Sequence, residues 1–230
     1  MAKKSTSAPA PALDLGQDTY LRLKEAIRDG TFKVGDRLTE LDLAARLKVS
    51  RTPVREAMHR LEADGLLCYE PRRGVTVARP DHQMIIELYV MREALEGTAA
   101  GLAAQHASAI EVAALAELIE GESAYLTDGA ELSRINQRIH RLVYFAAHNR
   151  YLLRSLSSVA DTMTLLPTML GNIERAKEAH EEHLGLLAAI RAKDPAAAET
   201  AARHHLRSAQ RHRLSWLLRH DPQLDGGSSS

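Results

Sequence analysis

The chain has 230 residues, of which 45% are apolar, so it can bury one large hydrophobic core or two smaller ones. Its 30 Lys and Arg residues balance 30 Asp and Glu residues, which excludes a uniformly basic nucleic-acid coat and an acidic tail protein. The charge is nevertheless uneven, because residues 1–80 carry 15 basic and 11 acidic side chains and the rest of the chain carries 15 and 19. The positive charge therefore lies in the N-terminal third.

The composition also narrows the compartment and the fold class. The single cysteine, Cys68, cannot form an intrachain disulfide, and no stretch approaches about 18 uninterrupted apolar residues, so we expect a cytoplasmic protein that does not enter a membrane. Aromatic residues make up only 4% of the chain and alanine is abundant, which favours packed helices. Residues 1–13 and 221–230 lack hydrophobic periodicity, and we interpret them as a disordered leader and a flexible tail.

Residues 14–80 show the pattern of a small helical domain that ends in a β-hairpin. Three helices are expected from the apolar spacing and the turn residues, at Leu15–Ile27, from about Thr39 to Leu47, and from the N-cap residue Ser50 to Asp64. Two short β-like runs at 66–69 and 75–78 flank a basic turn. Two helices joined by a short turn and followed by such a hairpin predict a winged helix-turn-helix.

The third helix of this domain carries polar side chains opposite its apolar stripe. Its candidate DNA-binding residues are Ser50, Arg51, Thr52, Arg55 and His59. Arg51 and Arg55 lie one turn apart, and their guanidinium forks match the O6 and N7 acceptors of guanine in a major groove. Ser50 and Thr52 are suited to contact phosphates at the helix N-terminus.

The tip of the hairpin adds Arg72, Arg73 and Gly74, which suit a wing that lies along the DNA backbone or in a minor groove. An alternative interpretation is that all these charges are ordinary solvated side chains of a domain that mediates only protein contacts.

From residue 81 onward the pattern is helical without interruption. Six helices are expected at about 81–105, 109–126, 129–148, 150–166, 173–192 and 195–219. Residues 81–220 therefore form an antiparallel six-helix bundle, and the fold as a whole is mainly α. The domain boundary is expected at Pro80–Asp81, where a strand ends and Asp81 caps a long helix.

Several histidines of the bundle have a spacing that suits metal binding. Asn136 and His140 lie four residues apart on one face of a predicted helix, and His183 and His205 lie on the last two helices. If these helices line one core, three imidazoles and an amide oxygen converge as ligands for a divalent transition metal. Isolated histidines are more often surface or hydrogen-bonded core residues, so the spacing leaves both interpretations open.

Three runs in the N-terminal domain carry a family resemblance. The segments 35–41, 49–57 and 61–67 closely resemble the DNA-binding domain of the GntR family of bacterial transcriptional regulators. The resemblance implies a winged helix-turn-helix that binds double-stranded DNA. Many relatives have an arginine where this chain has Leu41, so the contact of that arginine is not assigned here.

The bundle carries a second resemblance. The segments 136–140, 182–191 and 203–206 resemble the FCD domain, the ligand-binding half of the FadR subfamily of GntR regulators, in its six-helix VanR-like type. The resemblance implies that Asn136, His140, His183 and His205 bind a metal such as Zn, Ni or Mn. His180 and His204 are the alternatives for the last two positions. Asparagine in place of aspartate is expected to weaken metal binding and to leave the site more positive.

Arg92 matches an arginine that relatives often direct into the pocket, which implies that it binds the carboxylate of an effector. Its alternative role is an i, i+4 surface pair with Glu96.

These resemblances predict a transcriptional regulator that is not an enzyme. The expected protein is a homodimeric repressor that binds an inverted-repeat operator and is released by a small organic acid at the metal site. One alternative is a metal-dependent hydrolase, although no persuasive general base accompanies the expected ligands. Another is a constitutive DNA binder with a purely structural metal.

Overall fold

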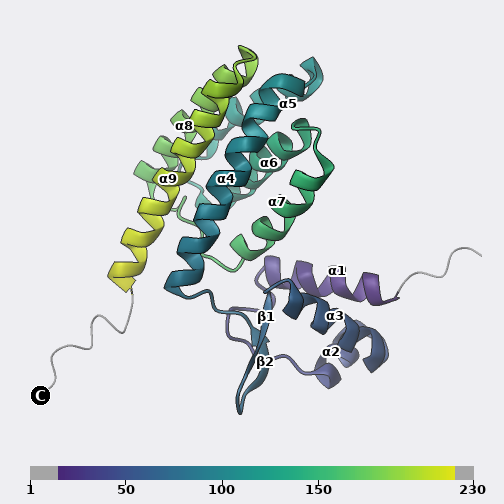
Figure 1. Cartoon of the computed structure of the whole chain (residues 1–230). Coiled ribbons are helices and arrows are strands. Elements are labelled where there is room, and N and C mark those ends of the chain that lie inside the picture. Colours follow the sequence, from purple (N-terminus) through teal and green to yellow (C-terminus); the bar gives the residue numbers. More distant parts are fainter. Residues whose placement is uncertain (1–14, 221–230) are drawn as a thin grey trace, which may run out of the picture. The chain divides into compact units, whose positions relative to one another are not determined.

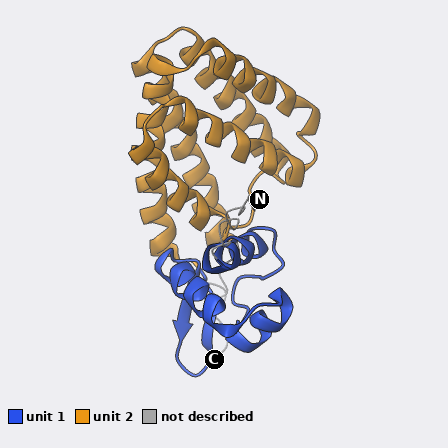
Figure 2. Cartoon of the chain, turned by 90° about the vertical axis from the view of Figure 1, so that its right-hand side faces the viewer, with its two compact units in different colours: residues 1–79 blue, residues 80–230 orange. Residues whose placement is uncertain are grey.

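The computed structural model of the chain describes residues 15–220, so the expected leader and tail lie outside the described residues. The chain divides between Arg79 and Pro80 into two compact units, an N-terminal unit and a helical unit (Figure 2). The mainly α fold with an N-terminal winged helix-turn-helix is confirmed (Figure 1). Among residues 15–220, no helix has both the length and the low polarity needed to cross a bilayer.

The N-terminal unit contains three helices and a two-stranded hairpin. Its elements are α1 (Leu15–Arg28), α2 (Glu40–Leu47), α3 (Arg51–Ala63), β1 (Leu67–Glu70) and β2 (Gly74–Val77). Thr39 caps α2, because its side chain accepts a hydrogen bond from the backbone N–H of Asp42. The apolar face of α3 is buried against α1, with Val54 and Leu61 at its centre.

The hairpin is antiparallel, and its register pairs Leu67 with Val77 and Glu70 with Gly74. The turn between the strands requires positive φ angles, 70° at Arg72 and 86° at Gly74. Glycine adopts this conformation without steric cost, which explains its position at the start of β2. The basic side chains therefore lie in a tight turn at the tip of the wing.

The helical unit contains six α-helices among the described residues. Its elements are α4 (His82–His106), α5 (Ala109–Gly121), the 3₁₀ turn η1 (Glu122–Tyr125), α6 (Gly129–Ala146), α7 (Arg150–Met163), α8 (Ile173–Arg191) and α9 (Pro195–His220). The central pair is α4 and α9, with α8 beside α9 and with α6 and α7 on the other side of α4 (Figure 1).

The second helix of the bundle ends earlier than its periodicity predicts. Instead of running to residue 126, α5 ends at Gly121 and the chain continues as η1, in which Glu122 is buried. The fourth helix also ends early, at Met163 instead of residue 166. The earlier end of α5 matters more for the site, because it places the carboxylate of Glu122 in the core.

Close packing of α4 against α9 depends on small residues. A Cβ atom at Gly97 would lie 2.9 Å from Cγ of Arg203, closer than real Cβ atoms come to a neighbour. Fully buried alanines on both helices, such as Ala100, Ala103 and Ala198, extend the close contact. The short distance between these helices brings the side chains of α9 into the centre of the unit.

Candidate functional site

The N-terminal end of α3 presents the residues expected to contact DNA. The side chains of Arg51 and Arg55 are 62% and 57% exposed. Ser50 occupies the N-cap position, but its side chain makes no capping hydrogen bond. Thr52 and His59 are exposed as well, and His59 lies 3.7 Å from the carboxylate of Glu62. These side chains form one accessible polar face.

Both arginines of this face bind the same carboxylate. Nη2 of Arg51 donates to Oε2 of Glu40 at 2.9 Å, and Nε of Arg55 donates to Oε1 at 2.7 Å. The hydrogen bonds from Arg55 and Arg51 lower the pKa of Glu40 to about 2. Glu40 therefore holds the two guanidinium groups next to each other, and any DNA acceptor has to compete with it.

The two arginines of the wing differ in how firmly their side chains are held. Arg73 pairs with Glu70 at 2.9 Å and donates to the backbone oxygen of Gly35 at 3.2 Å, so its side chain is fixed against the body of the unit. Arg72 is exposed in the turn, next to the half-buried Gly74. The wing thus presents one arginine that is held and one that extends into solvent.

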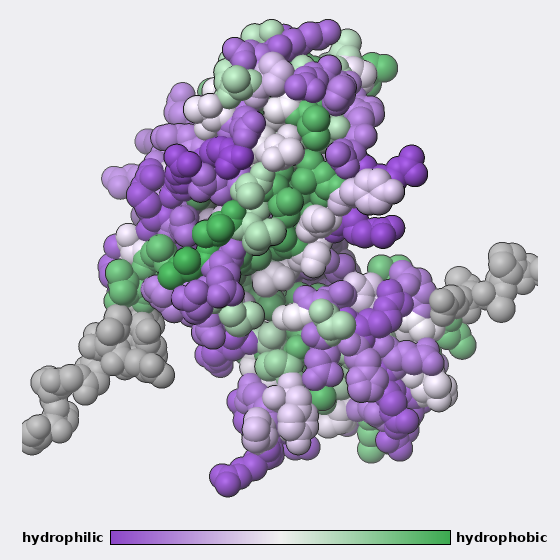
Figure 3. All heavy atoms as spheres, viewed as in Figure 1, coloured by the Kyte–Doolittle hydropathy of each residue, from purple (hydrophilic) through white to green (hydrophobic). Residues whose placement is uncertain are grey.

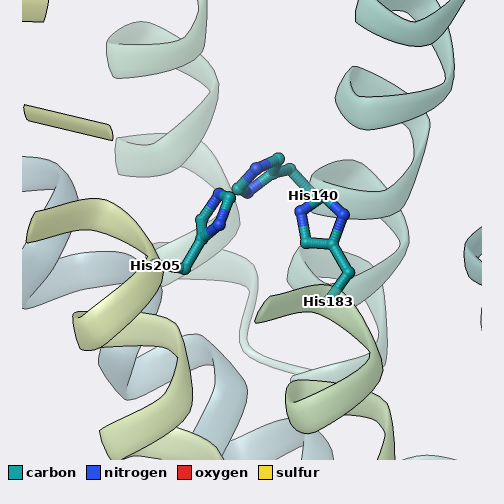
Figure 4. Close-up of side chains that lie close together, drawn as sticks. All are labelled: His140, His183 and His205. Carbon is teal, nitrogen blue, oxygen red and sulfur yellow. The ribbon is translucent and has the colours of Figure 1, made fainter. Parts of the chain in front are cut away.

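Three histidines come together inside the helical unit. His140 of α6, His183 of α8 and His205 of α9 form the histidine cluster, in which the candidate ligand atoms all lie within 4.8 Å of one another (Figure 4). His183 is 1% and His205 is 5% exposed. A small cavity beside the cluster is lined also by apolar side chains of the three helices, including Ile139, Leu186 and Ala202.

Each imidazole of the histidine cluster contacts a buried carboxylate through Nδ1. The distances to Nδ1 are 2.6 Å from Glu96 to His140, 2.9 Å from Glu122 to His183 and 2.7 Å from Glu182 to His205. Because an ionised carboxylate can only accept, each Nδ1 carries the proton and donates it. Nε2 of each ring therefore keeps its lone pair, as in metal-binding histidines whose orientation a carboxylate fixes.

The unpaired Nε2 atoms are the strongest indication that the cluster binds a ligand. Nε2 of His140 and Nε2 of His183 are buried, and neither has a hydrogen-bond partner in the part of the chain that the structure describes. Leaving buried acceptors unpaired is costly, whereas a cation bound at the cluster would satisfy them. The donor set of the cluster therefore fits a divalent transition metal.

Two buried arginines neutralise part of the surrounding negative charge. Arg92 pairs with Glu96 at 2.7 Å, and Arg175 pairs with Glu182 at 2.9 Å. Burial alone would raise the pKa of Glu96, but the charges of Arg92 and His140 hold it well below its ordinary value. Glu96 therefore stays ionised, and its negative charge would offset part of the charge of a bound dication.

The same surroundings keep His205 neutral. Burial is the main cause that lowers its pKa well below the ordinary 6.5, and the neighbouring His183, His140 and Arg175 lower it further. A neutral imidazole is the form that binds a metal.

Comparisons with known proteins find a family match for the N-terminal unit and another for the helical unit. Residues 15–77 match the family described as bacterial regulatory proteins of the gntR family, and residues 87–208 match the FCD domain family. The chain belongs to the GntR family and carries an FCD domain. Members of this family regulate transcription, so this regulator binds DNA.

Individual relatives give the same result. The regulator is 37% identical over 145 residues to the HTH-type transcriptional regulator YdhC of Bacillus subtilis, covering 62% of this chain and just under two thirds, 65%, of that protein. It is 35% identical over 187 residues to the "Probable D-xylose utilization operon transcriptional repressor" of Paenarthrobacter nicotinovorans, covering 78% of this chain and 80% of that protein. The structure of McbR/YncC from E. coli superposes with a TM-score of 0.71 and 26% identity, covering 90% of this chain and 99% of that one.

The structure brings three of the four predicted metal ligands together. His140, His183 and His205 come together, whereas Asn136 is half-buried one turn earlier on α6 and is not among the residues that line the cavity. Its role as a ligand remains a prediction. The alternative His180 instead contacts Glu122 at 3.3 Å.

The other alternative, His204, has a side chain that is largely exposed and lies 4.0 Å from Glu182, outside the histidine cluster. Arg92 forms the i, i+4 pair with Glu96, but the pair is buried and not at the surface. Its predicted contact with an effector stays a prediction.

Sequence reasoning missed the partners of the two sites. Apart from the i, i+4 pair of Glu96 with Arg92, no spacing signal linked these carboxylates to their partners. Glu40, Glu96 and Glu122 lie 11, 44 and 61 residues from Arg51, His140 and His183. Glu182 follows no spacing signal either, and it binds the ring of His205.

Replacing a carboxylate around the cluster tests its orienting role. We expect Glu122→Gln to weaken metal binding by roughly 10- to 100-fold, because the amide no longer holds the His183 tautomer that exposes Nε2. Competition with a chromophoric chelator measures the affinity. Glu120→Gln is the matched control, since Glu120 is exposed and binds Arg191. Equal affinity in wild type and Glu122→Gln would contradict the role of Glu122.

The neutral state of His205 predicts a pH dependence of the metal-free protein. Below about pH 6.5 the imidazole of His205 takes up a proton in the unfolded chain but not in the folded chain. The free energy of unfolding of the metal-free protein therefore falls as the pH is lowered below this value. We expect His205→Gln to reduce the loss of stability between pH 7.5 and 5.5 by up to about 1.4 kcal/mol per pH unit. Urea unfolding of the wild type and of His205→Gln at several pH values measures this difference in stability. Parallel profiles for the two proteins would show that His205 titrates normally.

Proposed function

We propose that this regulator is a homodimeric repressor that binds an inverted-repeat operator and is released when a small carboxylate binds to a metal ion in the helical unit. The observation that carries the proposal is the buried histidine cluster, whose Nδ1 atoms are held by carboxylates and whose Nε2 atoms at His140 and His183 are unpaired. A cluster built only for packing would not leave these acceptors buried without partners.

The metal would be held by Nε2 of His140, His183 and His205, with Asn136 as the predicted fourth ligand. Zn, Ni or Mn suits imidazole ligands. When bound, the ion supplies positive charge and free coordination positions for the oxygens of an acid. The apolar lining of the adjacent cavity would exclude water, which strengthens the attraction between the ion and a carboxylate.

An exposed apolar band supports the homodimer. Apolar side chains run diagonally across one face of the helical unit, over α4 and the C-terminal part of α9 (Figure 3). Met84, Val90 and Met91 of α4 and Leu218 of α9 are exposed large hydrophobic residues of these two helices. Contiguous apolar surface of this kind marks protein interfaces, and a dimer would supply two recognition helices for two half-sites.

Release from DNA requires the effector to distinguish two arrangements of the dimer. The free energy available equals the difference in effector affinity between the DNA-bound and released arrangements. Repression as the direction of control is supported by the relative from Paenarthrobacter nicotinovorans, which is named a repressor.

A thermal-shift screen of small carboxylic acids tests the proposal. We expect one class of acid to raise the midpoint of the metal-loaded protein by several degrees and to have no effect after chelation, since a ligand at 100 times its Kd adds about 2.7 kcal/mol. A midpoint that falls on chelation but responds to no acid in either form would instead support a constitutive DNA binder with a structural metal.

The DNA-binding surface gives a second prediction. On an operator obtained by in vitro selection, Arg55→Ala is expected to lose roughly 1–3 kcal/mol of binding free energy and to relax the base preference. Arg72→Ala should weaken binding to all sequences alike and reduce the slope of the logarithm of the binding constant against the logarithm of the salt concentration by about one. Fluorescence anisotropy on selected and random duplexes measures both. An identical loss on the two duplexes for Arg55→Ala would refute base reading.

A further inference from the structure

Leu41 of α2 is the most exposed large hydrophobic residue in the described part of the N-terminal unit. Its exposed fraction is 69%, compared with 51% for Leu21 of α1 and 66% for Tyr69 of β1. Leu43, two residues later, is 1% exposed and lies in the core. Because consecutive residues of a helix are rotated by about 100°, Leu41 points away from the core that holds Leu43. Its side chain therefore contributes little to the packing of this unit.

Leu41 follows directly after the residue that binds both predicted base-contacting arginines. That residue, Glu40, accepts hydrogen bonds from Nη2 of Arg51 at 2.9 Å and from Nε of Arg55 at 2.7 Å. The Cα atoms of Glu40 and Leu41 are about 3.8 Å apart, so even with extended side chains the leucine methyl groups lie within roughly 15 Å of both guanidinium groups. Successive base pairs are about 3.4 Å apart, which places Leu41 within about four base pairs of the bases that these arginines would contact.

The first turn of α2 is fixed by its own hydrogen bonds. The backbone N–H of Asp42 donates to Oγ1 of Thr39 at 3.1 Å, and Oγ1 of Thr39 donates to Oδ2 of Asp42 at 2.7 Å. The carboxylates on both sides of Leu41 are thus engaged within the chain, that of Asp42 by Thr39 and that of Glu40 by the two arginines. The backbone that carries Leu41 is already ordered, which lowers the entropic cost of a contact with DNA.

The chemistry of DNA defines what an apolar side chain at this place can contact. A leucine has neither charge nor hydrogen-bonding groups, so it makes no favourable polar contact with phosphates or with the donors and acceptors of the base edges. The apolar group that the bases present in the major groove is the C5 methyl group of thymine. The positive charge of the neighbouring Arg51 and Arg55, which are 62% and 57% exposed, favours a polyanion over an apolar protein surface as the partner of this face.

We propose that Leu41 is a specificity-determining residue that contacts the C5 methyl group of a thymine in the operator, close to the bases that Arg51 and Arg55 contact. This inference rests on one part of the proposed function, the base contacts of α3, and it is independent of the metal and of the effector. It adds a thymine at a defined place to the DNA sequence that the protein prefers.

Replacement of thymine by uracil tests the proposal, because uracil lacks only the C5 methyl group. The probes are duplexes of an operator obtained by in vitro selection, in which the thymines are replaced one position at a time, and fluorescence anisotropy measures their binding to the full chain. We expect the wild type to bind about three- to fivefold less tightly when one particular thymine is replaced, as removal of one buried methyl group implies. Leu41→Ala should bind the thymine and uracil duplexes with equal affinity.

Matched variants separate the methyl contact from a general effect on folding. Leu21→Ala removes an exposed leucine of α1 and should keep the full preference for thymine over uracil. Leu41→Met keeps an apolar side chain of similar volume and should retain most of that preference. The thermal midpoint of Leu41→Ala should equal that of the wild type, because substitution of an exposed side chain changes stability little.

Several results would overturn the inference, and they differ in what they leave standing. Equal binding of every uracil duplex by the wild type would exclude a methyl contact, and a preference for thymine that persists in Leu41→Ala would assign the contact to another residue. Wild-type affinity of Leu41→Ala for all duplexes would remove Leu41 from the DNA interface and favour a protein partner. In each case a loss of base preference in Arg55→Ala would leave the proposed base contacts standing, whereas failure to select any operator would overturn both.

Discussion

The helical unit depends on the pairing of each imidazole of the histidine cluster with one buried carboxylate. The carboxylates fix the protons on Nδ1 and direct the Nε2 atoms toward one another, and the imidazoles make the burial of Glu96, Glu122 and Glu182 tolerable. Two buried arginines complete the network from outside. Because each imidazole and its carboxylate bind each other, removal of one leaves the other without that partner in a low-dielectric core. The network therefore specifies both the packing of the helices and the position at which a cation can bind.

This network joins elements that are far apart in the sequence. One carboxylate comes from α4 and one from η1, and the rings come from α6, α8 and α9. The network therefore links four of the six helices of the unit and the 3₁₀ turn. The first of these helices, α4, begins at His82, only a few residues after the last strand of the N-terminal unit ends at Val77. Under the proposed function, this segment of chain would be one route by which a difference in effector affinity biases DNA binding.

Arginine–carboxylate pairs serve opposite purposes in the two units. The pairs of Arg92 with Glu96 and of Arg175 with Glu182 are buried, so each guanidinium provides a partner for a carboxylate that burial removes from water. The pairs of Arg51 and Arg55 with Glu40 are exposed, so they hold the two guanidinium groups in place at little cost in free energy. If these arginines contact bases as predicted, each contact would have to replace an ion pair with Glu40, which would disfavour sequences that lack matching acceptors.

The sequence by itself determined the winged helix-turn-helix, the six helices and three of the residues that converge in the core. Periodicity, caps and turn residues are local properties, and the spacing of His140, His183 and His205 placed each on its own helix, where the family resemblance linked them. Only the tertiary structure decided which groups surround them. The end of α5 at Gly121, which buries Glu122, and the contacts of Glu96 and Glu40 with distant partners depend on how helices pack. The i, i+4 pair of Arg92 and Glu96 was visible in the sequence, but its burial was not. Local spacing fixes which side chains share a helix face, whereas desolvation and partner choice follow from the elements packed against that face.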